Sequence, residues 1–345
     1  MIDEEVFFEV KGSLGLITLN RPKALNALTL SMVREIHPKL KEWENNPSVK
    51  NVLIKAEGEK AFCAGGDIRA LHDWGRNNDK EATGFYREEY ILNQYIKRYS
   101  KPYISLVNGI VMGGGVGLSV HGSYRIAGEN YSFAMPETGI GLFPDVGGSF
   151  FLPRLDYEAG TYLALTGNRI KASDAIFLGT ATNYIKSENF SDLLEDLSEE
   201  QNDPKHIIEK YSTNPSESEF KKISQFCDKI FKGNTVEEIV ENLKNENSDL
   251  SKKILSTIKQ KSPTSLKVAL KSLRLGKEIN FEECMMMEFR MVNKVMNDHD
   301  FYEGVRALII DKDNNPNWKP NKISEVEDSF VDEFFYKLDD DLKFN

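Results

Sequence analysis

Residues 103–118 read YISLVNGIVMGGGVGL, and this stretch decides the fold. The apolar run Tyr103–Val107 has the length and composition of a strand that is buried on both faces. Glycines at 109 and 113–115 then form a turn, after which a helix is expected to begin near Val116. A buried strand that leads through a glycine-rich turn into a helix is typical of α/β proteins.

The same pattern extends to both sides of this stretch. Further short strands are expected at 6–10, 16–19, 52–54, 124–127 and 132–134. A helix is expected to start near Thr29, and Pro38 predicts a distortion or a break in it, because proline lacks the amide that a helix interior uses. The glycine-rich loop 58–67 leads into further helical segments, with Asp67 as an N-cap. The sequence therefore predicts an α/β architecture.

The character of the chain changes after the core. We expect residues 1–185 to form the core that carries the substrate site, and residues 251–345 to form a helical region that completes the same domain. Between them, residues 186–250 carry sixteen Asp and Glu against eight Lys and Arg, which favours an acidic, mostly helical insertion. A partner-binding surface is the alternative for this segment. The methionines at 285–287 are interpreted as adaptable core packing, with a ligand groove as the alternative.

Composition limits the classes of function and the location of the protein. The net charge of −10 over 345 residues disfavours a nucleic-acid partner, and the apolar stretches are too short for a membrane span. Three scattered cysteines fit a reducing compartment. The first ten residues, MIDEEVFFEV, are acidic where a presequence would be basic. These features predict a cytoplasmic protein.

A second glycine turn precedes the one at 113–115. Residues 61–67 read AFCAGGD and follow the expected strand at 52–54. Backbone N–H groups at the start of a helix are unpaired, so two strand–glycine–helix turns could direct two donors at one carbonyl oxygen, as an oxyanion hole does. A purely structural role would use the same residues. The glycine spacing fits neither a dinucleotide fingerprint nor a P-loop.

Two carboxylates lie in the stretch 134–148, AMPETGIGLFPDVGG, which otherwise consists mainly of small and apolar residues. Burial would raise the pKa of Glu137 and Asp145 toward the range useful for acid–base chemistry. Gly139, Gly141 and Pro144 allow the chain to fold back and bring both to one acyl group. The alternative is that each carboxylate caps a helix or pairs with a backbone amide, which is more plausible for Asp145.

The motifs MGGGVGLSVHG at 112–122 and MPETGIGLFPDVGGSFFLPRL at 135–155 resemble those of the crotonase superfamily, and in particular its branch of 3-hydroxyisobutyryl-CoA hydrolases. The likeness continues in FYREEY at 85–90, LTG at 165–167 and FYEGVRALIIDKDNNPNW at 301–318. It covers nearly the whole chain, least clearly over 186–250. The resemblance implies a spiral of ββα units with a helical C-terminal region. It also implies an enzyme that hydrolyses the thioester of a small 3-hydroxyacyl-CoA, in valine breakdown.

The resemblance also implies roles for individual residues. The amides of Gly66 and Gly114 would bind the thioester oxygen, and Glu89, Gly114, Glu137 and Asp145 would line the substrate site. Glu137 would act as nucleophile or as general base. By the same resemblance, hydratases of the superfamily have a glutamate at the position where this chain has Gly117. Hydration is therefore not expected. We include Ala64, in the turn of Gly66, among the substrate-binding residues.

The remaining expectations concern ligands and rival chemistries. Lys23, beside a turn, could meet the CoA phosphates, and CoA is part of the substrate, so no cofactor is expected. The five histidines lack metal-ligand spacing, and Ser119 and His121 lack the G-x-S-x-G context of a nucleophile, so neither a metal site nor a Ser–His mechanism is expected. Another acyl-CoA reaction of the superfamily, or a catalytically silent scaffold, is the alternative function. A homo-oligomer is possible.

Overall fold

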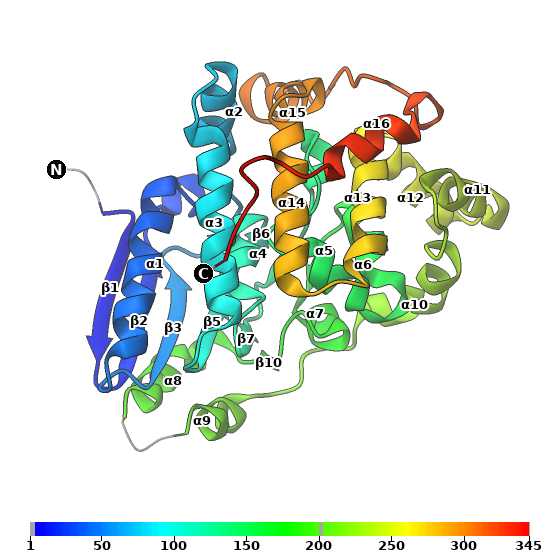
Figure 1. Ribbon diagram of the computed structural model, residues 1–345. Coiled ribbons are helices and arrows are strands. Elements are labelled where there is room, and N and C mark those ends of the chain that lie inside the picture. The colour runs from blue at the N-terminus through cyan, green and yellow to red at the C-terminus, as the bar shows by residue number, and fades with distance from the viewer. Residues whose placement is uncertain (1–3, 200–202, 345) are drawn as a thin grey trace. The chain divides into compact units, whose positions relative to one another are not determined.

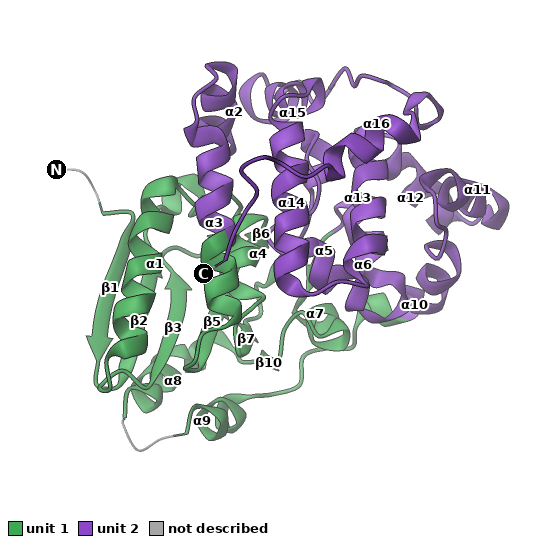
Figure 2. Cartoon of the chain, viewed as in Figure 1, with its two compact units in different colours: residues 1–66, 91–133, 169–221 green, residues 67–90, 134–168, 222–345 purple. Residues whose placement is uncertain are grey.

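The computed structural model describes residues 4–199 and 203–344 (Figure 1). The chain divides into two compact units, each built from three separate segments (Figure 2). Unit 1 comprises residues 1–66, 91–133 and 169–221, and unit 2 comprises residues 67–90, 134–168 and 222–345.

Unit 1 contains two sheets. The six-stranded sheet has the order β1 (Val6–Lys11), β2 (Leu14–Leu19), β3 (Asn51–Ala56), β5 (Tyr103–Val107), β7 (Tyr124–Ala127) and β10 (Asn183–Tyr184). The first pair is antiparallel, and β2, β3, β5, β7 and β10 pair in parallel. The four-stranded sheet has the order β4 (Ala61–Cys63), β6 (Ile110–Met112), β8 (Ser132–Ala134) and β9 (Ile170–Lys171). The strand positions predicted from the sequence are confirmed.

The strands come in successive pairs that divide between the sheets. In the pairs β3–β4, β5–β6 and β7–β8, the first strand joins the six-stranded sheet and the second joins the four-stranded sheet. Helices follow the first three strand pairs: α1 (Leu30–Asn45) after β1–β2, α2 (Ile68–Arg76) and α3 (Glu81–Lys97) after β3–β4, and α4 (Gly114–Ser119) after β5–β6. The element order is therefore a repeat of ββα units, as predicted.

Apolar side chains from one face of the six-stranded sheet pack against two helices of the acidic segment. Leu193 and Leu197 of α8 (Phe190–Ser198) and Ile208 of α9 (Pro204–Tyr211) belong to one buried cluster with sheet residues such as Leu53 and Ile104. Residues 186–250 also contain α10 (Glu219–Ile230) and α11 (Val236–Glu246). The predicted boundaries at 185 and 250 remain predictions.

Helix α1 begins after the N-cap Thr29, as predicted, but the expected break at Pro38 does not occur. The helix runs unbroken from Leu30 to Asn45. Pro38 is exposed, and so is Arg34, which lies one helical turn before it. Water can satisfy a carbonyl on an exposed helix face, and the buried Leu40 and Trp43 anchor the helix beyond the proline.

Unit 2 is helical. Besides α2, it contains η2 (Glu137–Ile140), α5 (Gly148–Phe151), α6 (Ala159–Thr166), α12 (Asp249–Ile258), α13 (Pro263–Gly276), α14 (Phe281–Val295), α15 (His299–Val305) and α16 (Asp328–Asp332). Met285 and Met287 of α14 are buried, which confirms their interpretation as core, whereas Met286 between them is half-buried. Within residues 4–199 and 203–344, no helix is long and apolar enough to cross a membrane.

Candidate active site

Two glycine turns of unit 1 lie at one edge of the four-stranded sheet. The first follows β4 at residues 64–66, and the second follows β6 at residues 113–114. The two strands are parallel neighbours, with Ala61 opposite Ile110 and Cys63 opposite Val111. The carboxyl ends of parallel strands meet at the same edge of a sheet, so the two turns are brought together.

The close approach of α4 to β4 leaves no room for a side chain. A Cβ on Gly115 would lie 2.3 Å from the carbonyl oxygen of Cys63. Gly65 and Gly113 have φ angles of +120° and +44°, which residues with a side chain rarely adopt. The backbone itself therefore requires glycine at these three positions.

The amides of Gly66 and Gly114 are placed as donors. Gly114 is the first residue of α4, where N–H groups find no partner inside the helix. Among the turn and loop hydrogen bonds of residues 4–199 and 203–344, neither amide donates to a carbonyl. An oxyanion hole requires a pair of backbone donors with no other acceptor, and these turns supply two candidates.

Two further predicted residues of unit 1 lie near these turns. The amide of Ala64 donates to the carbonyl oxygen of Leu25 at 3.1 Å, so it is not free to bind another group. Lys23 is exposed and lines a cavity of about 330 Å³ together with Lys60. Two ammonium groups at an open cavity suit an anionic ligand, although Glu57 and Glu59 line the same cavity.

The three predicted carboxylates lie together in unit 2. Glu89 is on α3, Glu137 begins η2, and Asp145 lies in the loop before α5. All three are buried, with exposed fractions of 1%, 5% and 4%. Burial raises the pKa of both glutamates and the charge of Asp145 raises it further, and the hydroxyl of Tyr90, the residue after Glu89, lies 2.9 Å from Oδ2 of Asp145. The three carboxylates form one cluster, which we call the carboxylate cluster.

Three polar atoms at the carboxylate cluster have no hydrogen-bond partner among the described residues. They are the hydroxyl of Tyr86, Oε1 of Glu89 and Oε2 of Glu137. An unpaired buried polar group costs about 1–3 kcal/mol, so such atoms are rare in folded proteins. Their concentration at one place indicates that a bound molecule completes the hydrogen bonds.

Asp145 already has a partner. The hydroxyl of Tyr90 donates to its Oδ2 at 2.9 Å. The alternative that the Asp145 side chain caps the next helix is wrong, because α5 begins after Gly147 and has no side-chain cap. Asp145 contributes only its backbone carbonyl there, which accepts from the amide of Gly148 at 2.7 Å.

Burial is the main cause of the pKa shifts in the carboxylate cluster. It raises the pKa of Glu137 well above the usual range, Asp145 adds to that rise, and the Lys261 ammonium opposes it. Burial also raises the pKa of Asp145 to about 7, against the hydrogen bond from Tyr90, which lowers it. Carboxyl groups with raised pKa values can exchange protons near neutral pH.

Four residues beside the carboxylates were not predicted from the sequence. In α3, Tyr86 lies three residues before Glu89 and four residues before Tyr90. Residues at these spacings share one face of a helix, so Tyr86 lies beside both. That spacing could have identified the tyrosines. Lys261 and Glu288 carry no local signal, since they approach the cluster only through the fold of unit 2.

The rival chemistries find little support in the described residues. The hydroxyl of Ser119 donates to the carbonyl oxygen of Gly115 at 2.8 Å, within its own helix. Within residues 4–199 and 203–344, no group of His, Cys, Asp and Glu side chains has the arrangement of a metal site.

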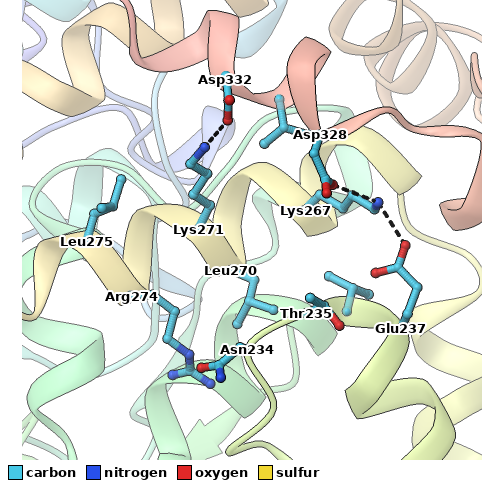
Figure 3. Close-up of a pocket in the computed structure, with 12 residues that line it drawn as sticks. Asn234, Thr235, Glu237, Lys267, Leu270, Lys271, Arg274, Leu275, Asp328 and Asp332 are labelled. Carbon is cyan, nitrogen blue, oxygen red and sulfur yellow. Dashed lines mark hydrogen bonds and ion pairs between the residues drawn. The ribbon is translucent and has the colours of Figure 1, made fainter.

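A separate cavity of about 450 Å³ in unit 2 shares no residue with the carboxylate cluster (Figure 3). It lies along α13, and the cations that line it are already paired. Lys267 contacts Glu237 at 2.8 Å and Asp328 at 3.3 Å, and Lys271 pairs with Asp332. Arg274 pairs with Glu158 at 2.9 Å. Charges that are already neutralised by neighbours give an anionic substrate little to bind.

The comparisons with known proteins agree with one another on the superfamily. A family model described as "Enoyl-CoA hydratase/isomerase" matches residues 14–335. The chain is 50% identical to "3-hydroxyisobutyryl-CoA hydrolase, mitochondrial" of Danio rerio, over 98% of this chain and 91% of that protein. It is 48% identical to the Homo sapiens protein of the same name, over 99% and 91%.

Solved structures reproduce the fold over nearly the whole chain. A carnitinyl-CoA dehydratase from Mycobacterium thermoresistibile superposes with a TM-score of 0.95 at 35% identity, over 99% of both chains. An enoyl-CoA hydratase from Rhodobacter sphaeroides 2.4.1 gives a TM-score of 0.92 at 37% identity, over 99% of this chain and 100% of the other. The predicted spiral fold with a helical C-terminal region is confirmed.

Proposed function

Because this chain belongs to the enoyl-CoA hydratase/isomerase family, we propose that it is an acyl-CoA thioester hydrolase whose substrate is 3-hydroxyisobutyryl-CoA. The products are 3-hydroxyisobutyrate and free CoA. The observation that carries the proposal is the identity of 48–50%, over nearly the full chain, to proteins named for this reaction. The buried carboxylate cluster supplies the chemistry that the reaction needs.

The first part of the mechanism is stabilisation of negative charge. Attack on a thioester carbonyl moves charge onto its oxygen. In the proposal, the amides of Gly66 and Gly114 donate to that oxygen. Removal of one such donor typically lowers kcat by about 10²–10³. The support is the position of both turns at one edge of the four-stranded sheet.

The second part is activation of the nucleophile. Glu137 either removes a proton from the attacking water, or attacks the carbonyl itself and forms an anhydride that water then opens. In the general-base route the C–S bond breaks and the CoA thiolate takes up the proton that Glu137 removed from water. In the anhydride route the C–S bond breaks when the anhydride forms, and the thiolate takes up a proton from water; the water that then opens the anhydride gives its oxygen to the product acid and regenerates the Glu137 carboxylate. The unpaired Oε2 of Glu137 and its raised pKa suit either role.

The third part is recognition of the acyl group and of CoA. We assign the 3-hydroxyl of the substrate to Asp145, Glu89 and Tyr86. The unpaired atoms of Glu89 and Tyr86 support this assignment, since a hydroxyl both donates and accepts. Lys23 would bind the CoA phosphates, and Ala64 would offer its carbonyl oxygen, because its amide is already used.

The proposed reaction uses no cofactor and no metal, since water and a carboxylate suffice for thioester hydrolysis and CoA is part of the substrate. The pathway that the relatives' name implies is the breakdown of valine. Chelator treatment that leaves the rate unchanged would agree with the metal-free proposal, and a loss restored by one divalent ion would contradict it.

The decisive experiment follows free thiol with a disulfide reagent across a panel of short acyl-CoA esters. We expect thiol release from 3-hydroxyisobutyryl-CoA, slower release from isobutyryl-CoA, and no hydration of crotonyl-CoA. A methyl group in an apolar pocket shifts selectivity by only about 10–200-fold, so 3-hydroxypropionyl-CoA should also react. Absence of thiol release from every 3-hydroxyacyl ester would overturn the proposal.

A lyase is the second candidate, because the two solved structures with TM-scores of 0.95 and 0.92 are titled as a dehydratase and a hydratase. Gly117 argues against it. Addition of water to a double bond needs two acid–base groups, and by the family resemblance this chain has glycine at one of the two positions. A change in absorbance of the conjugated thioester, without thiol release, would favour the lyase.

We keep the cytoplasmic location and the homo-oligomer as proposals of their own. The relatives' names place those proteins in mitochondria, which stands against a cytoplasmic location. Fractionation of cells that express the native protein decides the first point. Light scattering after size-exclusion chromatography decides the second.

A further inference from the structure

We propose that Glu288 is a positioning residue that holds the turn carrying Asp145. The proposal rests on the function proposed above, and it adds a residue on a different helix. Glu288 lies on α14, is fully buried, and is separated from Asp145 by more than 140 positions in the chain.

Both carboxylate oxygens of Glu288 bind the turn directly after Asp145. The amide of Gly147 donates to Oε2 at 2.8 Å, and the amide of Ser149 donates to Oε1 at 2.9 Å. The hydroxyl of Ser149 donates to Oε1 at 2.5 Å. These three contacts occupy both oxygens of the Glu288 carboxyl group, and hydrogen bonds of this kind are about twice as strong to an ionised acceptor as to a neutral one.

The turn needs such support because its backbone is strained. Val146 has a φ of +50°, in the left-handed region that a β-branched residue rarely enters. Gly147 follows at +87°. Left-handed conformations of non-glycine residues persist where surrounding contacts enforce them, and they are concentrated at functional sites. Glu288 binds the two amides on the C-terminal side of Val146, so it enforces the bend that points Asp145 away from a regular helix start.

The geometry also explains why the turn is not capped in the usual way. The residue before α5 is Gly147, which has no side chain to cap the helix. Glu288, on α14, accepts instead from the amides of Gly147 and Ser149 at the start of α5. Asp145 is thereby released from capping, and its carboxyl group stays with Tyr90 and the carboxylate cluster.

Glu288 acts on the cluster through its charge as well. Burial and the charge of Asp145 raise the pKa of Glu89 and of Glu137, and Glu288 adds to that rise. Burial raises its own pKa to about 8, and Asp145 contributes to that rise. The titratable groups that face the cluster come from several elements: Tyr86, Glu89 and Tyr90 of α3, Glu137 of η2, Lys261 before α13, Glu288 of α14 and Tyr302 of α15.

The test compares Glu288→Gln with the unchanged protein. A carboxamide has one acceptor oxygen, so its NH₂ group must face one of the turn's donors. We expect amide exchange at Gly147 and Ser149 to accelerate at least 10-fold, and kcat for 3-hydroxyisobutyryl-CoA to fall at least 10-fold with KM changed less.

Two further variants separate the placement of the Glu288 carboxyl group from a nonspecific effect of substitution in α14. Glu288→Asp keeps both carboxyl oxygens but shortens the reach, so amide exchange at Gly147 and Ser149 should accelerate and kcat should fall; this variant also decides the matter if Glu288→Gln does not fold. Glu283→Gln makes the same exchange at an exposed position of the same helix; glutamine can still accept from the amide of Asn280, so amide exchange at Gly147 and Ser149 and kcat should stay unchanged.

Unchanged amide exchange at Gly147 and Ser149, or a wild-type kcat in both Glu288 variants, would overturn the proposal. Failure of the proposed function is a distinct result. In that case the unchanged protein releases no thiol, while the exchange experiment still reports whether Glu288 holds the turn.

Discussion

Replacement of Gly115 by alanine should inactivate the enzyme by displacing its neighbour. The added Cβ would lie 2.3 Å from the carbonyl oxygen of Cys63, where ordinary contact begins near 3.4 Å. It would also lie 2.8 Å from the Cβ of Cys63, so the nearest atoms belong to backbone and to a short side chain that cannot move away. Helix α4 must therefore move away from β4 by about 1 Å.

The expected magnitude follows from that shift. Gly114 directly precedes Gly115, so its amide moves with the helix. A displacement of about 1 Å can lower a rate about 10²-fold, and the complete loss of one oxyanion donor costs about 10²–10³ in kcat. We expect kcat to fall within this range and KM to change little. Overpacking should also lower the free energy of unfolding by about 1–3 kcal/mol.

The assay is thiol release under saturating 3-hydroxyisobutyryl-CoA, with thermal unfolding followed by circular dichroism. Gly84→Ala is the matched control. Gly84 lies in α3, where a Cβ would meet only the flexible end of Glu81 at 3.4 Å, so the exchange should preserve activity and raise stability by about 0.5–1 kcal/mol. A folded Gly115→Ala protein with wild-type kcat would refute the role of the Gly114 amide.

The remaining predictions concern the carboxylate cluster. Glu137→Gln should abolish turnover while CoA-ester affinity, measured by calorimetry, stays within a few-fold of the original; near-normal turnover removes the central catalytic claim. Asp145→Asn should reduce kcat/KM for 3-hydroxyisobutyryl-CoA more than for isobutyryl-CoA, and equal losses would exclude recognition of the hydroxyl. Tyr86→Phe should raise the unfolding temperature, because it removes an unpaired buried hydroxyl, and should raise KM roughly 10-fold. A lower unfolding temperature with an unchanged KM would contradict a role of this hydroxyl in substrate binding. The pKa of Asp145 is about 7 in the folded protein against an ordinary value of 3.8, so the folded state holds a proton that the unfolded chain has released. Its contribution to stability is therefore present at low pH and is lost as the pH rises through 7, which unfolding at pH 5 and pH 8 in wild type and Asp145→Asn would reveal.

Local sequence signals predicted the elements that depend on local physics. The buried strand Tyr103–Val107, the helix start at Thr29 and the N-cap Asp67 lie where the sequence placed them, because strand burial and capping are decided within a few residues. The break expected at Pro38 does not occur, because the effect of this proline is not decided locally. Whether a proline breaks a helix depends on whether the carbonyl that it leaves free faces water, and only the tertiary structure decides that.

The candidate site shows the same division. Glu137 and Asp145 stood out because carboxylates are unusual in an apolar stretch. Glu288 did not, since it reads as one more glutamate in the helical segment EECMMMEFRM. Its partners, Gly147 and Ser149, are 141 and 139 positions away, and no local pattern encodes such a pairing.

The interleaved make-up of the two units has a consequence for biosynthesis. Unit 1 is complete once residue 221 has been translated, whereas unit 2 needs the final segment, 222–345. Until α14 emerges from the ribosome, the turn after Asp145 lacks the acceptor that holds it. The acidic groups of unit 2 therefore enter their core late, after the sheets of unit 1 can have formed. A premature stop anywhere between residues 222 and 288 should leave a chain that has every segment of unit 1 but lacks part of unit 2. The acidic and apolar segments of unit 2 should then be exposed to quality-control proteases.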